Sequence, residues 1–263
     1  MPLVPPSDDL DLIVDVAESA SAIAMRYFRN ESLVVNYKDN SSPVSEGDLA
    51  VDTFLRETLT KARPTYGWLS EETADVSPAA RIAAPRTFIV DPIDGTRAYI
   101  GGLDTWCISI AVVEDGRPIA GVLHCPALNE VHSAFLGDNQ QDPAIDEKTH
   151  KLMIGGSGAL INKLTHLLPD HTLMESHYVP SLAYRIAMVA DGRLAGTFIR
   201  QNAHEWDLAA ADLIASNKGA RLVDRSGQPI AYNSVNPKQG PLVCAAPALI
   251  GPMLDVVTGQ TFR

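Results

Sequence analysis

Cysteine, long apolar runs and clustered positive charge are all scarce in this sequence of 263 residues. Its three cysteines stand apart with no CxxC pair, which favours reduced thiols in a cytosolic protein over a disulfide framework or a zinc site. No stretch approaches the roughly 18 unbroken apolar residues of a membrane-spanning helix. The first residues lack the basic and apolar regions of a signal peptide, so we expect a cytoplasmic location and no membrane partner.

The charge balance is acidic, because 21 Lys and Arg residues stand against 32 Asp and Glu residues, for a formal net charge of −11. An acidic protein without a Lys/Arg-rich run repels nucleic-acid polymers and anionic lipids. If the substrate is a small anion, bound divalent cations are the usual means of inverting the local charge. A dinucleotide-binding oxidoreductase is excluded, because no G-x-G-x-x-G follows a strand and opens a helix; the glycines at 155–158 are too closely spaced.

Hydrophobic periodicity predicts an α/β protein with two halves, residues 1–145 and residues 146–263, separated by a polar stretch. A loop is expected over 39–47, and an Asp-Gly hairpin turn at 115–116. The expected helices cover 8–29, 48–62, 157–168, 181–190, 207–217 and 246–257. The expected strands cover 67–69, 87–90, 107–113, 118–124, 130–135, 171–175, 194–199, 221–223 and 242–245.

The segment with the strongest chemical signal follows the expected strand 87–90 and reads Asp91-Pro92-Ile93-Asp94-Gly95-Thr96. Pro92 cannot continue ladder pairing, so two carboxylates lie at the carboxyl end of a strand. Gly95 allows close approach of a ligand to the backbone, and free N–H groups at a helix start can bind phosphate oxygens. In isolation, Asp94 could equally be a helix cap and Asp91 a turn residue.

Two further acidic sites favour a functional role for Asp91 and Asp94 over these structural roles. Glu71, beside Glu72, ends the expected strand 67–69, where a Glu pair would otherwise be solvated surface. Asp207 follows Trp206 and precedes an Ala-rich helix, where a cap is the ordinary reading but burial is expected.

Taken together, these motifs resemble the inositol monophosphatase superfamily: Ser42-Pro43-Val44-Ser45-Glu46-Gly47-Asp48, then Glu71-Glu72, then the segment 91–96, then Trp206-Asp207. They occur in order across nearly the whole chain, and their detail is nearest to bacterial 3′(2′),5′-bisphosphate nucleotidases. The resemblance implies a layered αβαβα sandwich and a homodimer. Residues 1–145 would carry the metal and phosphate motifs, and residues 146–263 would add Asp207 and the substrate contacts.

By motif position, the resemblance implies one Mg²⁺ bound by Glu71, Asp91 and the carbonyl of Ile93, and a second bound by Asp91, Asp94 and Asp207. A third ion would lie near Glu71. Gly95 and Thr96 would bind the phosphate through backbone amides, and Thr96 with Glu71 and Asp48 would orient the attacking water. Hard oxygen ligands favour Mg²⁺ or Mn²⁺ over Zn²⁺. Family members are often inhibited by Li⁺, and we expect the same here.

The substrate is a small phosphate ester whose identity the motifs leave open. Arg200, seven residues before Asp207, replaces the acidic residue that bonds sugar hydroxyls in inositol-selective relatives. Arg200 and Arg185 could each contact a second phosphate, or each could be an exposed surface arginine; Glu205 is a third candidate contact. We favour a 3′(2′),5′-bisphosphate nucleotide, with inositol monophosphate next. Arg97 and Tyr99 are reminiscent of histidinol phosphatases, and a regulatory protein that keeps the phosphatase fold is a further alternative.

Overall fold

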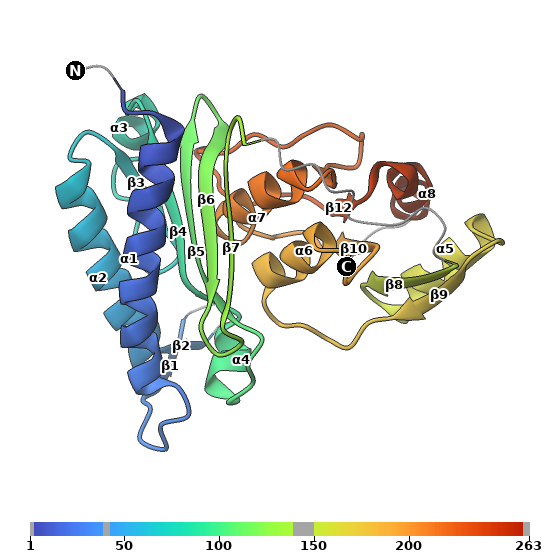
Figure 1. Cartoon of the computed structure of the whole chain (residues 1–263), viewed down its shortest axis with the longest axis horizontal. Helices are drawn as coiled ribbons and strands as arrows, with labels where there is room; N and C mark the ends of the chain where they lie inside the picture. The colour runs from blue at the N-terminus through green and yellow to red at the C-terminus, as the bar shows by residue number, and fades with distance from the viewer. Residues whose placement is uncertain (1–2, 39–42, 139–149, 260–263) are drawn as a thin grey trace.

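The computed structural model describes residues 3–38, 43–138 and 150–259, which form five layers in the order helices, sheet, helices, sheet, helices (Figure 1). The expected αβαβα sandwich is therefore confirmed. The predicted division between residues 145 and 146 lies outside the described residues. A bilayer-spanning helix is absent from the described ranges.

The first sheet has the strand order β3-β4-β5-β6-β7, with β3 and β4 parallel and the other neighbours antiparallel. Its strands are β3 (Gly67–Ser70), β4 (Thr87–Asp94), β5 (Cys107–Glu114), β6 (Arg117–Cys125) and β7 (Glu130–Phe135). Asp115 and Gly116 join β5 to β6 with φ of 48° and 74°, as a two-residue hairpin turn requires. The expected Asp-Gly turn is thus confirmed.

Helices α1 (Pro6–Tyr27) and α2 (Glu46–Ala62) cover one face of this sheet (Figure 1). Their apolar faces and the sheet bury one continuous hydrophobic cluster that includes Ile13, Leu55, Phe88 and Trp106. The amino-terminal end of α2 is formed by a capping box, in which Ser45 and Asp48 satisfy each other's backbone amides.

The middle layer consists of α6 (Leu182–Ala190) and α7 (Glu205–Asn217), which pack between the two sheets (Figure 1). The second sheet has the order β11-β12-β10-β8-β9. Its strands are β8 (Lys151–Gly155), β9 (Thr172–Glu175), β10 (Gly196–Ile199), β11 (Arg221–Val223) and β12 (Leu242–Ala245). The outer layer comprises α5 (Gly158–Leu167) and α8 (Pro247–Thr258).

The expected helices and strands all occur, with ends shifted by a few residues, and the helix start expected after Gly95 is α4 (Thr96–Ile100). Four short elements were not predicted: β1 (Val35–Tyr37), β2 (Pro43–Ser45), α3 (Pro78–Ala83) and β8. The expected loop 39–47 is wrong at its end, since β2 pairs with β1 and α2 already begins at Glu46. Residues 39–42 of that loop lie outside the described residues. Elements of three to six residues carry too few periods for their pattern to be recognised.

Candidate metal centre

Three carboxylates converge where β4 ends and α7 begins. Asp91 and Asp94 belong to β4 and Asp207 to the first turn of α7, and each offers an oxygen within 4.8 Å of the others. Glu71 follows β3, the parallel neighbour of β4, and lines the same cavity of about 210 Å³. The structure therefore brings together all four acidic side chains that the motifs singled out.

The local course of β4 explains how two of these carboxylates meet. Side chains three residues apart in a regular strand point to opposite faces of the sheet. Here the pairing of β4 with β5 shifts register between Asp91 and Asp94, and Pro92 lies in the interruption. The Asp91 carboxylate accepts a hydrogen bond from the Ile93 amide at 3.0 Å. This bulge redirects the chain so that both carboxylates face one cavity.

Gly95 and Thr96 form the part of the cavity wall that follows Asp94. Gly95 has a φ of 94°, and a Cβ there would lie 3.0 Å from the Cβ of Ser181. A side chain is thus disfavoured both by the backbone conformation and by the neighbour. The turn that follows Asp94 therefore requires glycine at this position.

Asp48 lies behind this wall and is joined to it through a hydroxyl. One carboxylate oxygen accepts the Thr96 Oγ1 hydrogen bond at 3.2 Å, and the other accepts from the Ser45 amide at 2.8 Å and Oγ at 2.6 Å. Burial raises the pKa of Asp48 to about 6. Asp48 thus contacts the cavity only indirectly, by orienting Thr96.

The carboxylates of the cluster oppose one another's ionisation. Burial and the neighbouring carboxylates, Glu71 first among them, raise the pKa of Asp91 well above its ordinary value. Burial and the charge of Asp94 likewise raise the pKa of Asp207. Burial raises the pKa of Asp94 to about 6, even though hydrogen bonds to the carboxylate counteract it. Such a set of buried hard oxygen donors fits a divalent cation of the Mg²⁺ type.

Ile93 is fully buried, and its carbonyl oxygen lies 3.2 Å from Thr96 Oγ1, where it shares the single hydroxyl proton with Asp48. This oxygen lies between the two β4 carboxylates in the sequence. It is the one predicted ligand atom that belongs to the backbone.

Lys38, which the sequence analysis did not single out, also reaches this region. Its ammonium pairs with Glu71 at 3.0 Å and with Glu72 at 2.7 Å. Burial raises the pKa of Glu72 to about 7, although the hydrogen bond and the positive charge of Lys38 act to lower it. Only the tertiary structure brings this lysine, which immediately follows β1, next to residues that follow β3.

Ser181 is a second missed residue. It is the N-cap of α6, and its Oγ donates a hydrogen bond to Asp94 Oδ2 at 2.5 Å while accepting one from the Tyr184 amide at 3.0 Å. The amides of Leu182 and Ala183 donate to the same carboxylate at 3.3 and 2.6 Å. Asp94 is therefore held by the amino-terminal end of α6, whose dipole favours a negative charge. A serine at the start of the expected helix 181–190 was the available signal.

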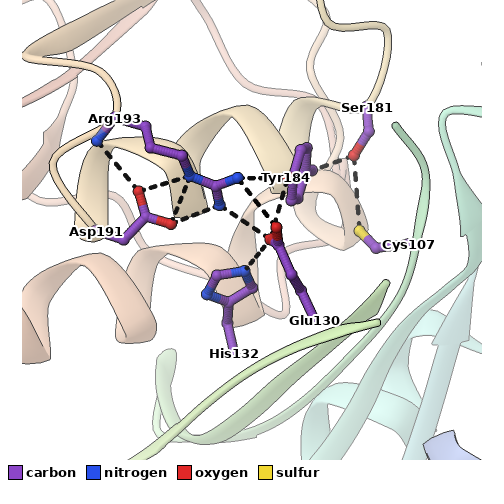
Figure 2. Close-up of polar contacts among 7 residues, drawn as sticks. All are labelled: Cys107, Glu130, His132, Ser181, Tyr184, Asp191 and Arg193. Atoms are coloured by element: carbon purple, nitrogen blue, oxygen red, sulfur yellow. Dashed lines mark hydrogen bonds and ion pairs between the residues drawn. The ribbon is translucent and has the colours of Figure 1, made fainter. Parts of the chain in front are cut away.

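The side of α6 that faces β7 is also fixed (Figure 2). Tyr184 Oη donates to Glu130 on β7 at 3.0 Å, and Arg193 binds Tyr184 at 2.6 Å, Glu130 at 3.0 Å and Asp191 at 2.5 Å. The first sheet thus holds α6 through Asp94 at one point and Glu130 at another. This double attachment positions the other side chains of the helix.

The predicted substrate contacts lie in two different places. Arg185 and Arg200 both line a second cavity, of about 360 Å³, whose wall shares Tyr178 and Pro180 with the first. Glu205 does not line either cavity: it is fully buried and accepts hydrogen bonds from the amides of Asn233 at 2.6 Å and Ser234 at 3.1 Å. The prediction of a substrate contact from Glu205 is corrected accordingly, because its carboxylate anchors a loop of the protein.

Of the two residues reminiscent of histidinol phosphatases, only Arg97 is near the centre. It is exposed and lines the smaller cavity. Tyr99 is fully buried, and its hydroxyl donates to the carbonyl of Ala24 on α1 at 2.7 Å. Tyr99 is therefore part of the core between α1 and the first sheet.

Comparison with known proteins gives one family. Residues 7–253 match the model of the "Inositol monophosphatase family". A 3′(2′),5′-bisphosphate nucleotidase CysQ of Aggregatibacter actinomycetemcomitans is 29% identical over 247 residues, covering 86% of this chain and 89% of that protein. An inositol-1-monophosphatase of Mesorhizobium japonicum is 31% identical over 234 residues, covering 83% and 86%.

Further relatives have other names. A histidinol-phosphatase of Mycobacterium tuberculosis is 29% identical over 84% of this chain and 88% of its own, and a Nus factor SuhB of Pasteurella multocida is 26% identical over 94% and 95%. A solved IMPase/NADP phosphatase in complex with Mg²⁺ and phosphate superposes with a TM-score of 0.81 over 98% of this chain and 99% of that one, at 17% identity. At that identity the superposition shows a shared fold.

Proposed function

This chain belongs to the inositol monophosphatase family and is a Mg²⁺-dependent phosphomonoesterase, and we propose that it cleaves its ester by direct attack of water at the centre formed by Asp91, Asp94 and Asp207. The observation that carries this proposal is the approach of three largely buried carboxylates to within 4.8 Å, beside a glycine turn that lines the same cavity.

In the proposed site, Glu71, Asp91 and the Ile93 carbonyl hold one Mg²⁺, and Asp91, Asp94 and Asp207 hold a second. Glu71 would take part in binding a third ion, and Mn²⁺ could replace Mg²⁺, since all the ligand atoms are hard oxygens. When bound, the cations would supply Lewis-acid neutralisation of the charge on the phosphate oxygens.

The protein groups around the cations have separate tasks. The backbone amides of Gly95 and Thr96 would donate to the phosphate oxygens and orient the ester. Thr96 Oγ1, aligned by Asp48, would orient the attacking water from one side and Glu71 from another. The raised pKa of Asp48, about 6, is suited to a group that accepts a proton near neutral pH. None of these steps needs a phosphorylated protein residue.

We propose a 3′(2′),5′-bisphosphate nucleotide as the first candidate substrate and inositol monophosphate as the second. The CysQ relative and the presence of Arg200 where inositol-selective relatives carry an acid support this order. Histidinol phosphate is the alternative, supported by the relatives of that name and by Arg97 at the cavity.

The experiment is a comparison of kcat/KM for adenosine 3′,5′-bisphosphate, inositol 1-phosphate and histidinol phosphate, each with saturating Mg²⁺ and with EDTA. We expect turnover only with the metal, and the nucleotide to be the best of the three. If the nucleotide were the poorest, the order of substrates would be wrong. Turnover of all three at an undiminished rate in EDTA would contradict the metal centre itself.

A regulatory function through a macromolecular partner is the second candidate, favoured by the match to a Nus factor SuhB over 94% of this chain. A pull-down from lysate, run beside the turnover assay, tests it. Inhibition by Li⁺, a cytoplasmic location and a homodimer remain predictions from the family. Titration with LiCl, cell fractionation and light scattering would test these in turn.

A further inference from the structure

We propose that the cavity of about 360 Å³ beside the metal centre is a second anion-binding subsite, in which Arg185 and Arg200 bind a second phosphate group of the substrate. This inference rests on the proposed phosphatase function, and it names the class of substrate: a phosphate ester that carries another phosphate at a distance from the scissile one.

The position of the cavity is the first argument. Its wall shares Tyr178 and Pro180 with the cavity of the metal centre, so the two hollows lie on either side of the segment that leads into α6. Val179, which stands between Tyr178 and Pro180 in the sequence, is buried, and Ser181 donates a hydrogen bond to Asp94, so the segment is held where it enters α6. Tyr178 is 79% exposed. A molecule that reaches both hollows would therefore cross over an accessible aromatic ring.

The state of Arg185 is the second argument. Its Nε is buried and has no hydrogen-bond partner, and its Nη1 makes only a long hydrogen bond of 3.4 Å to the Val179 carbonyl. Within the described residues, no carboxylate lies within 4.0 Å of its guanidinium. Burial lowers the pKa of Arg185; the charge of Asp94 opposes this shift, and the charge of Arg200 adds to it. A half-buried guanidinium that makes no ion pair is partly desolvated, and a bound anion would offset part of that cost.

Arg200 supplies the second charge. It follows β10 directly, is exposed, and lines the same cavity; no ion pair of this side chain occurs among the described residues. Two guanidinium groups near one another repel, and they gain most from an anion that accepts hydrogen bonds from both. Their convergence on one cavity therefore favours a phosphate rather than the hydroxyl groups of a neutral sugar.

One carboxylate lines this cavity as well, and its position limits its effect. A Cβ placed on Gly158 would lie 2.8 Å from Glu175 Oε2, so this carboxylate lies against the first turn of α5. The helix dipole there attracts a negative charge. Two cations and one anion leave the hollow with a positive balance.

The test uses the purified full chain with Mg²⁺ and two nucleotides that differ by one phosphate, adenosine 3′,5′-bisphosphate and adenosine 3′-monophosphate. A third ester, p-nitrophenyl phosphate, reports the basal activity. The variants are Arg200→Gln, Arg200→Lys, Arg185→Gln and Arg185→Lys. The last of these keeps the positive charge at position 185 and is used if Arg185→Gln fails to fold. Arg225→Gln, an exposed arginine in the turn after β11, is the matched control.

We expect the wild type to prefer the bisphosphate over the monophosphate by at least about 10-fold in kcat/KM, which is the scale of one charge-assisted hydrogen bond. Arg200→Gln should lower kcat/KM for the bisphosphate by roughly 10- to 100-fold, mainly through KM. The same variant should lower kcat/KM much less for the two esters that lack a second phosphate, so the preference for the bisphosphate falls, and Arg200→Lys should restore part of it. Arg185→Lys should also weaken the preference, because an ammonium cannot make the bidentate contact.

Three results would overturn the inference: no preference in the wild type, an equal loss on all three esters in Arg200→Gln, or the same loss in Arg225→Gln. The proposed function fails separately, if the wild type with Mg²⁺ does not hydrolyse even p-nitrophenyl phosphate.

Discussion

Replacing Ser181 by Ala tests whether α6 positions Asp94, a proposed metal ligand. The hydroxyl donates a hydrogen bond to the Asp94 carboxylate at 2.5 Å, accepts one from the Tyr184 amide at 3.0 Å, and lies 3.6 Å from Cys107 Sγ (Figure 2). The loss of an N-cap costs about 1 kcal/mol and the loss of a bond to a charged group about 1.5–3 kcal/mol. Because the amides of Leu182 and Ala183 still hold Asp94, we take the lower end of this range, about 2–3 kcal/mol in all.

This free energy corresponds to a fall in Tm of roughly 5–10 °C, since 1 kcal/mol shifts a domain of this size by about 2–4 °C. Thermal unfolding in EDTA measures it. The functional effect is separate: removing a group that orients a metal ligand typically weakens metal affinity or activity by about 10- to 100-fold. A titration of turnover against Mg²⁺ should therefore show the half-saturation concentration rising by that factor.

The control is Ser77→Ala, because Ser77 is the exposed N-cap of α3 and makes no side-chain cap hydrogen bond. This variant should leave both Tm and the Mg²⁺ titration unchanged. If Ser181→Ala lowered Tm as expected but left the Mg²⁺ titration untouched, the hydroxyl would serve only to cap α6, and our reasoning about Asp94 would be refuted.

Three further predictions concern single residues. Asp91→Asn should abolish Mg²⁺-dependent turnover while circular dichroism stays native, and near-normal turnover at saturating Mg²⁺ would contradict the assignment. Gly95→Ala should destabilise the fold by about 1–2 kcal/mol in urea unfolding, because a Cβ is strained at a φ of 94°, and should slow turnover as the wall of the cavity shifts; an unchanged unfolding midpoint would count against this. Asp212 accepts the Tyr232 hydroxyl bond at 2.8 Å, and burial raises its pKa to about 6 from an ordinary 3.8. The folded state therefore binds this proton more tightly than the unfolded chain, so wild-type stability should fall as the pH rises from about 4 to 6. Asp212→Asn should flatten that region of the curve of unfolding free energy against pH, and a slope equal to the wild-type slope would argue against the shift.

The sequence was sufficient to place the acidic residues of the centre, because each stands at the end of an element with a clear hydrophobic pattern. The expected strand 87–90 stops just before Asp91, although β4 itself continues to Asp94, and the Ala-rich helix begins near Asp207, so both ends could be recognised from the local sequence. The long helices and the hairpin of the first sheet were predictable for the same reason.

What could not be predicted depends on contacts between distant segments. Lys38 reaches Glu71 and Glu72 only through the folding of β1 beside the centre, and no pattern in its own neighbourhood shows this. Glu205 stood next to the metal motif in sequence, yet its side chain turns to the amides of 233 and 234. Adjacency along a helix does not imply a shared face, because each residue rotates by about 100° from the last.

The bulge in β4 has a consequence for the far end of the sheet. The spacing of Asp91 and Asp94 depends on how β4 is aligned on β5, and β5 is aligned in turn on β6 by the tight turn at Asp115 and Gly116. A shift of one residue in the register of the hairpin would turn the side chains of β5 to the other face of the sheet. The residues of β5 that pair with β4 around the bulge would then no longer be in place. The Asp-Gly turn thus contributes to the alignment of the strands on which the two proposed ligands lie, and we expect an insertion there to disturb the spacing of Asp91 and Asp94.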